Sequence, residues 1–185
     1  MATTSCSDLT VPTDAVLPID DLLILPMQAG TPQPASASFW IHNSRQTVRR
    51  LVHPEAQLTP YLELTFPAGA LSSLSGVPLT DTDSVLVTVD PWPGQYGFTL
   101  SPAALTLNSA ALPTAKFFFG FYADAGVASQ SAKYSTASDY AAALDIWHEV
   151  TVAQWRVTAN SAAAGVDAVS ATTATTGEYV LAAPR

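Results

Sequence analysis

Three histidines, His42, His53 and His148, are the residues of this chain best suited to acid–base or metal chemistry near neutral pH. No two of them stand two or four positions apart, the spacing that brings two imidazoles to one metal ion. Glu149 follows His148 directly, but neighbouring residues on a strand point to opposite faces of a sheet. We therefore expect hydrogen-bonded histidines on strand faces and assign no catalytic residue, although a nucleophile and a base from distant segments can still meet in a fold.

The sequence also lacks the motifs of nucleotide chemistry. It contains no Gly-x-Ser-x-Gly elbow, no phosphate-binding loop and no glycine-rich dinucleotide fingerprint, so we expect no cofactor. Asp81 and Asp83 stand one residue apart before a strand, and with Thr80 they offer the oxygen ligands that Ca²⁺ prefers. The glycine and the distal glutamate of a calcium-binding loop are missing. A solvated turn is therefore favoured, and the two aspartates are only a weak calcium candidate.

Basic side chains gather at one point of the sequence. Arg45, Arg49 and Arg50 are three of only seven Lys and Arg residues in a chain of net charge −8. Such a patch could meet an anionic partner or an acidic surface of another copy. The simpler interpretation is charge balance within the chain, with Glu55 and Glu63 as partners.

Composition excludes several classes of protein. Hydrophobic residues make up 48% of the 185 residues and charged residues 12%, about half the usual charged share. A disordered acidic tail and a long coiled coil are excluded. So few Lys and Arg residues argue against a nucleic-acid partner. Because no run of about 18 apolar residues occurs, we expect no transmembrane segment.

The chain is predicted to consist of a proline-rich extended arm, residues 1–36, followed by one domain, residues 37–185. Five prolines recur in the arm too closely for a helix or a central strand. They are Pro12, Pro18, Pro26, Pro32 and Pro34. Within the arm, a short apolar run fits a single strand that needs a partner surface. It consists of Leu22, Leu23, Ile24 and Leu25. One hypothesis is that this run adds a strand to the open sheet of a neighbouring copy.

The single cysteine, Cys6, excludes an intramolecular disulfide. The small residues before it suggest a processed lipoprotein with Cys6 as the lipid acceptor, although Thr3 stands where such sites prefer an apolar residue. A free thiol is the simpler interpretation, and membrane contact is expected only if Cys6 is lipidated. The first residues do not form a signal peptide, so the chain is either cytosolic or a processed form. Low charge with many small hydroxyl residues is common in secreted and surface β-proteins, and we expect an extracellular, periplasmic or cell-surface location.

The remaining signals predict an all-β protein. About ten short segments rich in β-branched and aromatic residues are separated by turn residues, which is typical of a β-sandwich or an open barrel. We expect a β-sandwich of about eight to ten mostly antiparallel strands, with residues 116–122 as a central strand. One short helix is expected near residues 138–144, capped by Ser138.

Tryptophans and tyrosines divide into two groups. Trp40, Trp147 and Trp155 lie in expected strands, so they are expected in the core or on a sheet face. Trp92 and Tyr96 lie in a turn rich in proline and glycine. This pair either packs under the turn or is exposed, where it could stack on a sugar ring or seat a partner.

Residues 60–183 resemble the ZU5 family of domains. The resemblance begins with a strand and a Pro-x-Gly-Ala-Leu turn, LELTFPAGAL at residues 62–71. It continues through a strand at 84–89, the stretch GFTLSPAALTL at 97–107, an apolar strand at 115–122, and closing segments with Trp147, Trp155 and residues 177–182. Independently of any family, Pro67 should end strand pairing, Gly69 should allow a positive φ, and Leu71 should re-enter the core.

The resemblance implies a β-sandwich that serves as an interaction module. Some members of the family cut themselves at a His-Phe-Ser step in a late strand. This chain has TTGEY at residues 175–179 instead, so we expect no autoproteolysis.

Three functions are therefore open. The favoured one is a non-catalytic interaction or structural module of a bacterial envelope or surface protein, which binds a protein partner or itself. The alternative is a subunit of a larger assembly. The third is a glycan-active enzyme, which would need two carboxylates about 5–10 Å apart in a cleft.

Overall fold

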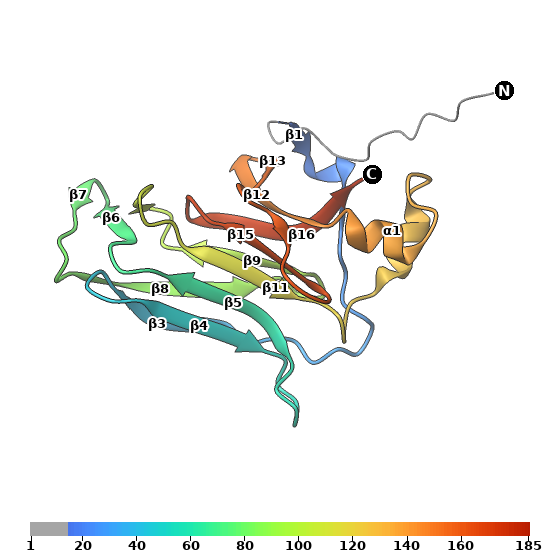
Figure 1. The fold of residues 1–185 in the computed structure, drawn as a ribbon, viewed down its shortest axis with the longest axis horizontal. Helices are drawn as coiled ribbons and strands as arrows, with labels where there is room; N and C mark the ends of the chain where they lie inside the picture. Colours follow the sequence, from blue (N-terminus) through green and yellow to red (C-terminus); the bar gives the residue numbers. More distant parts are fainter. Residues whose placement is uncertain (1–14) are drawn as a thin grey trace.

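Alternation between buried and exposed residues is clearest in β8 (Ser84–Pro91). Val85, Val87 and Val89 are buried, whereas Leu86 between them is 48% exposed. Side chains two positions apart lie on the same face of a strand, so one face of β8 packs into the core and the other faces solvent. A computed structural model describes residues 15–185, and their strands form a mostly antiparallel all-β sandwich (Figure 1).

The larger layer is an eight-stranded sheet. Its strands follow the order β1-β13-β12-β16-β9-β8-β3, and β2 pairs with β16 beside this path. Besides β8, the strands are β1 (Val16–Pro18), β2 (Leu22–Ile24), β3 (Ala37–His42), β9 (Gly97–Ser101), β12 (Asp145–Thr151), β13 (Gln154–Val157) and β16 (Gly177–Pro184). One end of this sheet is therefore formed by β3.

The facing layer has five strands in the order β14-β15-β11-β5-β4. They are β4 (Thr47–Val52), β5 (Pro60–Phe66), β11 (Thr114–Phe118), β14 (Ala162–Ala163) and β15 (Ala168–Thr172). The middle position of β11 confirms the expected central strand. The strand ends at Phe118 rather than reaching Tyr122, because the chain turns at Gly120, where a Cβ atom would lie 2.5 Å from a carboxylate oxygen of Asp167.

Short elements complete the structure. A three-stranded sheet has the order β10-β6-β7, formed by β6 (Leu71–Leu74), β7 (Val77–Pro78) and β10 (Leu105–Leu107). Two 3₁₀ helices, η1 (Ile19–Asp21) and η2 (Ala125–Gln130), accompany the α-helix α1 (Ala137–Ala142). The described residues thus form sixteen strands rather than eight to ten, because several strands have only two or three residues.

The predicted short helix is confirmed, but its cap is not the expected residue. Thr136 is the N-cap of α1, and its hydroxyl accepts a hydrogen bond from the amide of Asp139 at 3.0 Å. Ser138 lies inside the helix. A cap must precede the first helical residue in extended backbone, and Thr136 meets that condition with φ −141° and ψ 162°.

Aromatic rings from both layers fill the space between them. Phe117 of β11 lies 5.7 Å from Phe98 of β9 between ring centroids, and Phe98 stacks on Tyr179 of β16 at 5.0 Å. All three rings are buried. This packing places the core between the two large sheets.

The turn after β5 behaves as the sequence predicts. β5 ends at Phe66, directly before Pro67, and Gly69 has a φ of +76°. Leu71 then begins β6 and is 2% exposed. Glycine adopts this positive φ without steric penalty, so the chain can turn sharply between the two strands.

The segment before β3 folds against its own domain. The three residues of β2 pair with Ala182, Ala183 and Pro184 of β16, and the Tyr140 hydroxyl donates to the carbonyl of Leu23 at 2.9 Å. Neighbouring side chains of η1 and β2 pack on a second apolar cluster that includes Trp147. The strand expected at residues 22–25 exists, and the chain's own β16 provides its partner surface.

Candidate interaction surface

β3 forms an open sheet edge. Among residues 15–185 it pairs only with β8, in a regular ladder that runs from Ala37 opposite Val89 to His42 opposite Ser84. Natural proteins usually protect such edges with charged residues, prolines or bulges. β3 has the sequence ASFWIH, with no Lys, Arg, Asp, Glu or Pro, and its register has no shift. Its edge is therefore left without these protections.

The ladder also determines which backbone groups face outward. The amide of Asn43 donates to the carbonyl of Asp83 at 2.9 Å, in continuation of the β3–β8 register. Residues of the same parity, Ile41 and Phe39, therefore direct their backbone N–H and C=O groups toward β8. Ser38 and Trp40 then direct their N–H and C=O groups away from the sheet. These four groups have the geometry that a further strand requires.

Two apolar side chains flank this edge on the outer face. Trp40 is 55% exposed and lies directly opposite Leu86, which is 48% exposed. Next to them, the hydroxyls of Ser38 and Thr88 are 2.8 Å apart. The sequence predicted Trp40 in the core or on a sheet face. It lies on the face, because its parity in β3 is opposite to that of buried Ile41.

The neighbouring strand β4 is also an edge, but a protected one. It carries Arg49 and Arg50, and its pairing with β5 shifts register between Leu51 and Val52. Charges and a register irregularity both oppose further strand pairing. The contrast between the two adjacent edges singles out β3.

The arginines expected to form a patch have different environments. Arg50 forms an ion pair with Glu63, its cross-strand neighbour, and this confirms the simpler interpretation for that residue. The Arg49 guanidinium lies 5.9 Å from the ring centroid of Phe39, at the seam between β3 and β4. Arg45 is exposed in the turn that joins these strands. Glu55, the other expected partner, instead bonds with Thr59 and Tyr122, and these hydrogen bonds lower its pKa.

A buried amide holds the turn between β3 and β4 in place. Asn43 is 5% exposed, and its Nδ2 donates to the carbonyls of Leu71 and Thr80, each at 3.1 Å. Its Oδ1 accepts from the amide of Leu71 at 2.9 Å. Two of these hydrogen bonds fix the end of β3 to Leu71 of the small sheet, and the third fixes it to the turn before β8, so the open edge is preorganised.

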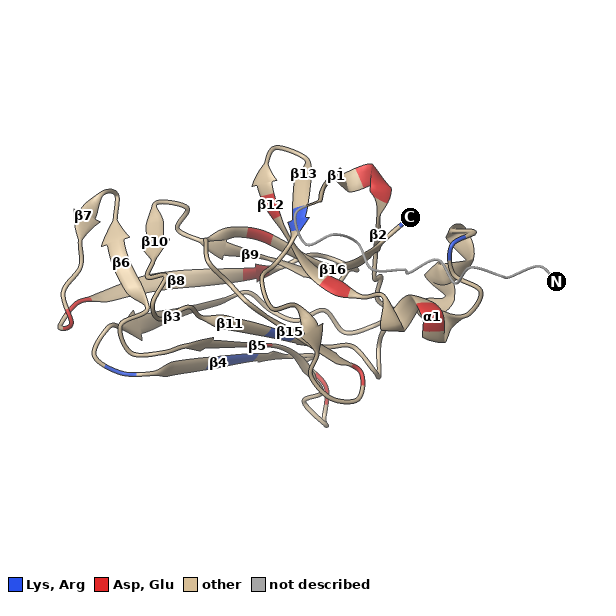
Figure 2. Ribbon diagram, turned by 45° about the horizontal axis from the view of Figure 1, so that its top comes forward, with Lys and Arg blue, Asp and Glu red and all other residues tan. Residues whose placement is uncertain are grey.

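Charge is distributed unequally between the two layers (Figure 2). The strands of the five-stranded sheet carry Arg49, Arg50 and Lys116 against one acidic residue, Glu63. The strands of the eight-stranded sheet carry four acidic residues, Asp90, Asp145, Glu149 and Glu178, against one basic residue, Arg156. Burial and the Glu149 carboxylate raise the pKa of Glu178. The basic part of the molecule therefore lies next to the open β3 edge.

The apolar run expected as a single strand packs on its own chain. Leu22, Leu23 and Leu25 are buried, and only Ile24 is half-buried. β16 of the same chain pairs with one hydrogen-bonding edge of the run, and the hypothesis that the run pairs with another copy stays a prediction.

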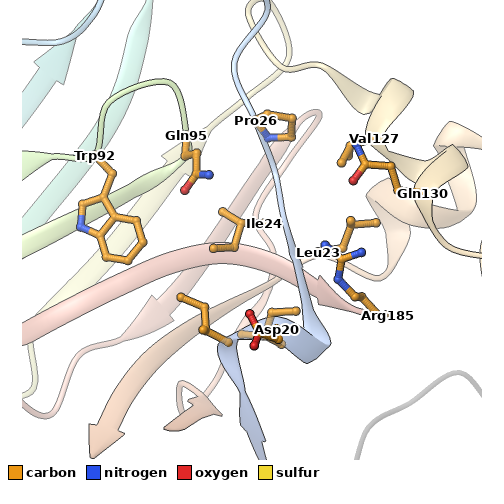
Figure 3. Close-up of a pocket in the computed structure, with 11 residues that line it drawn as sticks. Asp20, Leu23, Ile24, Pro26, Trp92, Gln95, Val127, Gln130 and Arg185 are labelled. Atoms are coloured by element: carbon orange, nitrogen blue, oxygen red, sulfur yellow. The ribbon is translucent and has the colours of Figure 1, made fainter. Parts of the chain in front are cut away.

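A cavity of about 440 Å³ lies beside β2. Figure 3 shows Trp92 and Gln95 on one side of the β2 chain, and Gln130 and Arg185 on the other. Because the strand runs between these polar groups, they do not converge on one point. The cavity therefore lacks the convergent polar groups of a small-molecule site.

The aromatic pair in the turn after β8 is packed rather than presented. Tyr96 is fully buried, so of the two alternatives the packed one holds for it, and it is not exposed to bind a partner. Trp92 is half-buried, its indole N–H donates to the Thr99 hydroxyl at 3.2 Å, and its ring meets Trp155 edge to face at 5.9 Å. Strand pairing between β8 and β9 draws both rings toward the sheets.

The remaining candidates have structural partners or lie outside the described residues. Asp83 accepts hydrogen bonds from the amide and hydroxyl of Thr80, which lower its pKa, while Asp81 is exposed in the same turn. Within residues 15–185, no three His, Cys, Asp or Glu side chains are grouped to hold a metal ion. Cys6 lies outside the described residues.

Two of the three histidines lie on strands as expected, His42 on β3 and His148 on β12, whereas His53 follows the end of β4. His53 is buried, with Nδ1 2.8 Å from the carbonyl of Pro32. His148 is half-buried, and burial and the Arg156 charge lower its pKa. A glycan-active enzyme needs two carboxylates in one cleft. Glu149 and Glu178 interact with each other, but the cavity beside His148 is lined by Glu149 and not by Glu178.

Comparisons with known proteins identify no relative that shows what this surface does. The chain matches no model of a known protein family and no curated protein sequence. Among the described residues, no helix is long and apolar enough to cross a membrane. The sequence alone did not identify the β3 edge. The sequence shows that residues 37–42 contain no Lys, Arg, Asp or Glu, but it does not show that this run lies at the edge of the sheet.

Proposed function

We propose that this protein is a non-catalytic interaction module that binds an extended segment of a protein partner by strand addition to β3. The observation that carries the proposal is the open edge itself: a regular, uncharged strand with outward N–H and C=O groups at Ser38 and Trp40. Strand addition gives affinity through backbone hydrogen bonds and specificity through alternate side chains.

The physical basis is the solvation of the edge. In the free protein, water satisfies the outward backbone groups of β3. An added strand replaces that water with up to four backbone hydrogen bonds, two to Ser38 and two to Trp40, each contributing about 0.5–1.5 kcal/mol. The ring of Trp40 provides apolar area beside these bonds, and exposed tryptophans are common binding anchors.

The proposal retains the extracellular, periplasmic or cell-surface location expected from composition. The resemblance of residues 60–183 to ZU5 domains supports an interaction role. Low charge agrees with a surface that presents a binding edge.

The test is to select binders from a library of random linear peptides displayed on phage. The selection is made with the wild-type protein and with a variant that has a proline at an outward-facing position of β3. Ser38→Pro removes an N–H that points away from β8, so the fold should survive while strand addition fails. Val166→Ser is the matched control, because Val166 is exposed and lies in the loop before β15. We expect the wild type and Val166→Ser to enrich the same extended peptides and Ser38→Pro to lose them.

Hydrogen exchange on the bound complex locates the site. Protection of the Trp40 amide on peptide binding would support the proposal. Unchanged exchange at Trp40, or identical peptide selection by Ser38→Pro and the wild type, would contradict it. Trp40→Ser gives a second variant without proline, in case Ser38→Pro fails to fold.

A further inference from the structure

We propose that the segment received by β3 is acidic, with carboxylate side chains alternating with apolar ones along an extended peptide. This inference rests on the proposed function, because it concerns the partner of the same edge. It follows from the side chains that border the edge on its two faces.

On the inner side, the border is basic. The Arg49 guanidinium lies 5.9 Å from the Phe39 ring, and Phe39 belongs to the inward-facing parity of β3. Arg45 is exposed in the adjoining turn. Within residues 15–185 the one ion pair is that of Arg50 with Glu63, so Arg45 and Arg49 have no carboxylate partner there.

On the outer side, the middle of the border is apolar. Trp40 and Leu86 are the large apolar side chains next to the edge, and the hydroxyls of Ser38 and Thr88 beside them are neutral. Two ionisable side chains of the same face, His42 and Asp90, lie toward the ends of β3 and β8. An apolar side chain of the added strand would cover part of the Trp40 ring. A charged side chain there would lose hydration without gaining a partner.

An added strand faces both borders in turn. Its side chains alternate between the two faces, so every second residue lies on the side of Trp40 and the others on the side of Arg49. Arginine binds carboxylates through charge-assisted hydrogen bonds of favourable geometry. The sequence that satisfies both borders therefore alternates apolar and acidic residues.

The same geometry disfavours a second copy that pairs through its own β3. Two β3 edges joined in this way would bring the Arg49 side chains of both copies to one seam. β3 itself supplies no carboxylate to compensate them. Like charges at close range lower affinity, so self-pairing is the less favourable occupant of the edge.

Two synthetic peptides test the inference by fluorescence anisotropy. In one peptide valine alternates with aspartate, in the other valine alternates with lysine, and each has a fluorescent label and Gly-Ser ends. At physiological ionic strength, where a screening length of about 8 Å weakens the distant net charge of −8 but not a contact with Arg49, we expect the wild type to bind the aspartate peptide at least about tenfold more tightly than the lysine peptide. The preference should decrease as salt is added.

Charge reversal assigns the effect to the edge. Arg49→Glu should abolish or invert the preference, whereas Arg156→Glu should leave it unchanged, because exposed Arg156 lies on β13, near the opposite end of the eight-stranded sheet. Neither arginine has an ion pair within residues 15–185, so both variants should fold.

The outcomes separate the two proposals. Equal binding of both peptides, with Ser38→Pro weakening each, would overturn the acidic partner and leave strand addition in place. If both the peptides and the displayed library fail to bind, the proposed function falls as well. The protein could instead form a dimer that the Ser38→Pro substitution dissociates and that the aspartate peptide leaves intact. That result would make a second copy the occupant of the edge and overturn the inference.

Discussion

Trp40 and Leu86 lie directly opposite each other on the outer face of the β3–β8 ladder, and about half of each side chain is exposed. A cross-strand pair of this kind gives a sheet some stability. At the last ladder of an eight-stranded sheet, it also leaves apolar area beside unpaired backbone groups. This relationship connects the fold of the protein to its proposed task.

Trp40 should matter far less for stability than Trp147. Trp40→Ser removes one partner of an exposed pair and is expected to lower the free energy of unfolding by about 1 kcal/mol. Trp147→Ala empties a fully buried site and removes the hydrogen bond from its Nε1 to the carbonyl of Ala182, so a loss of about 3–5 kcal/mol is expected. Urea denaturation of both variants measures the difference. Equal losses would make Trp40 a structural residue and weaken the case for the edge.

Two buried tyrosines should respond in opposite ways to loss of the hydroxyl. The Tyr61 hydroxyl donates to the carbonyl of Gly97 at 2.5 Å and accepts from its amide at 3.0 Å, so Tyr61→Phe should cost about 1–3 kcal/mol. The Tyr96 hydroxyl is buried without a hydrogen-bond partner in the structure. Tyr96→Phe should therefore be neutral or stabilising. A destabilised Tyr96→Phe variant would show that its hydroxyl has a partner, such as a buried water.

Glu178 should make stability depend on pH. Burial and the Glu149 charge raise its pKa above the ordinary 4.5, so the folded state binds this proton more tightly than the unfolded state does. Below pH 4.5 Glu178 is protonated in both states and does not affect stability. As the pH rises from 4.5 through the raised pKa of the folded state, the loss of this proton destabilises the fold. Glu178→Gln should thus increase the melting temperature at pH 7 and leave it unchanged in acid. Solvent screening keeps the gain below about 1 kcal/mol.

Glu63→Gln is the matched control for this pH effect. Glu63 is paired with Arg50, so removing its charge should bring no gain at pH 7. Parallel melting curves for the two variants across pH decide the matter. A gain for Glu178→Gln that persists unchanged in acid would rule out the carboxylate charge as its cause.

The β2 segment should stabilise its own domain rather than an assembly. Leu23 is 1% exposed, and Leu23→Ala should lower the free energy of unfolding by about 2–5 kcal/mol. The oligomeric state at equal concentration should not change, because β2 pairs with β16 of the same chain. Light scattering measures the oligomeric state and chemical denaturation the stability. A variant that dissociates without losing stability would instead support the hypothesis of a strand donated to a neighbour.

Local rules explain why much of the fold could be predicted. Pro67 and Gly69 determine the turn after β5 through their own backbone preferences. The alternation of residues 84–89 determines which face of β8 is buried, and the alanines of residues 141–143 favour the short helix. These features depend on neighbours in the chain, so the sequence alone predicts them.

The open edge of β3 could not be predicted from residues that are close together in the sequence. A six-residue β-run has the same sequence pattern in the middle of a sheet as at its edge, so only the order of strands shows that β3 has one partner and that β2 already has β16. Likewise, Tyr96 is in a turn by sequence yet is buried by Tyr61 and Phe117, at ring-centroid distances of 5.4 Å and 6.3 Å. The sequence determined the all-β class, the turns and the buried faces through short-range backbone preferences. Tertiary structure decided which edge stays open, because strand pairing joins residues that are far apart in the chain.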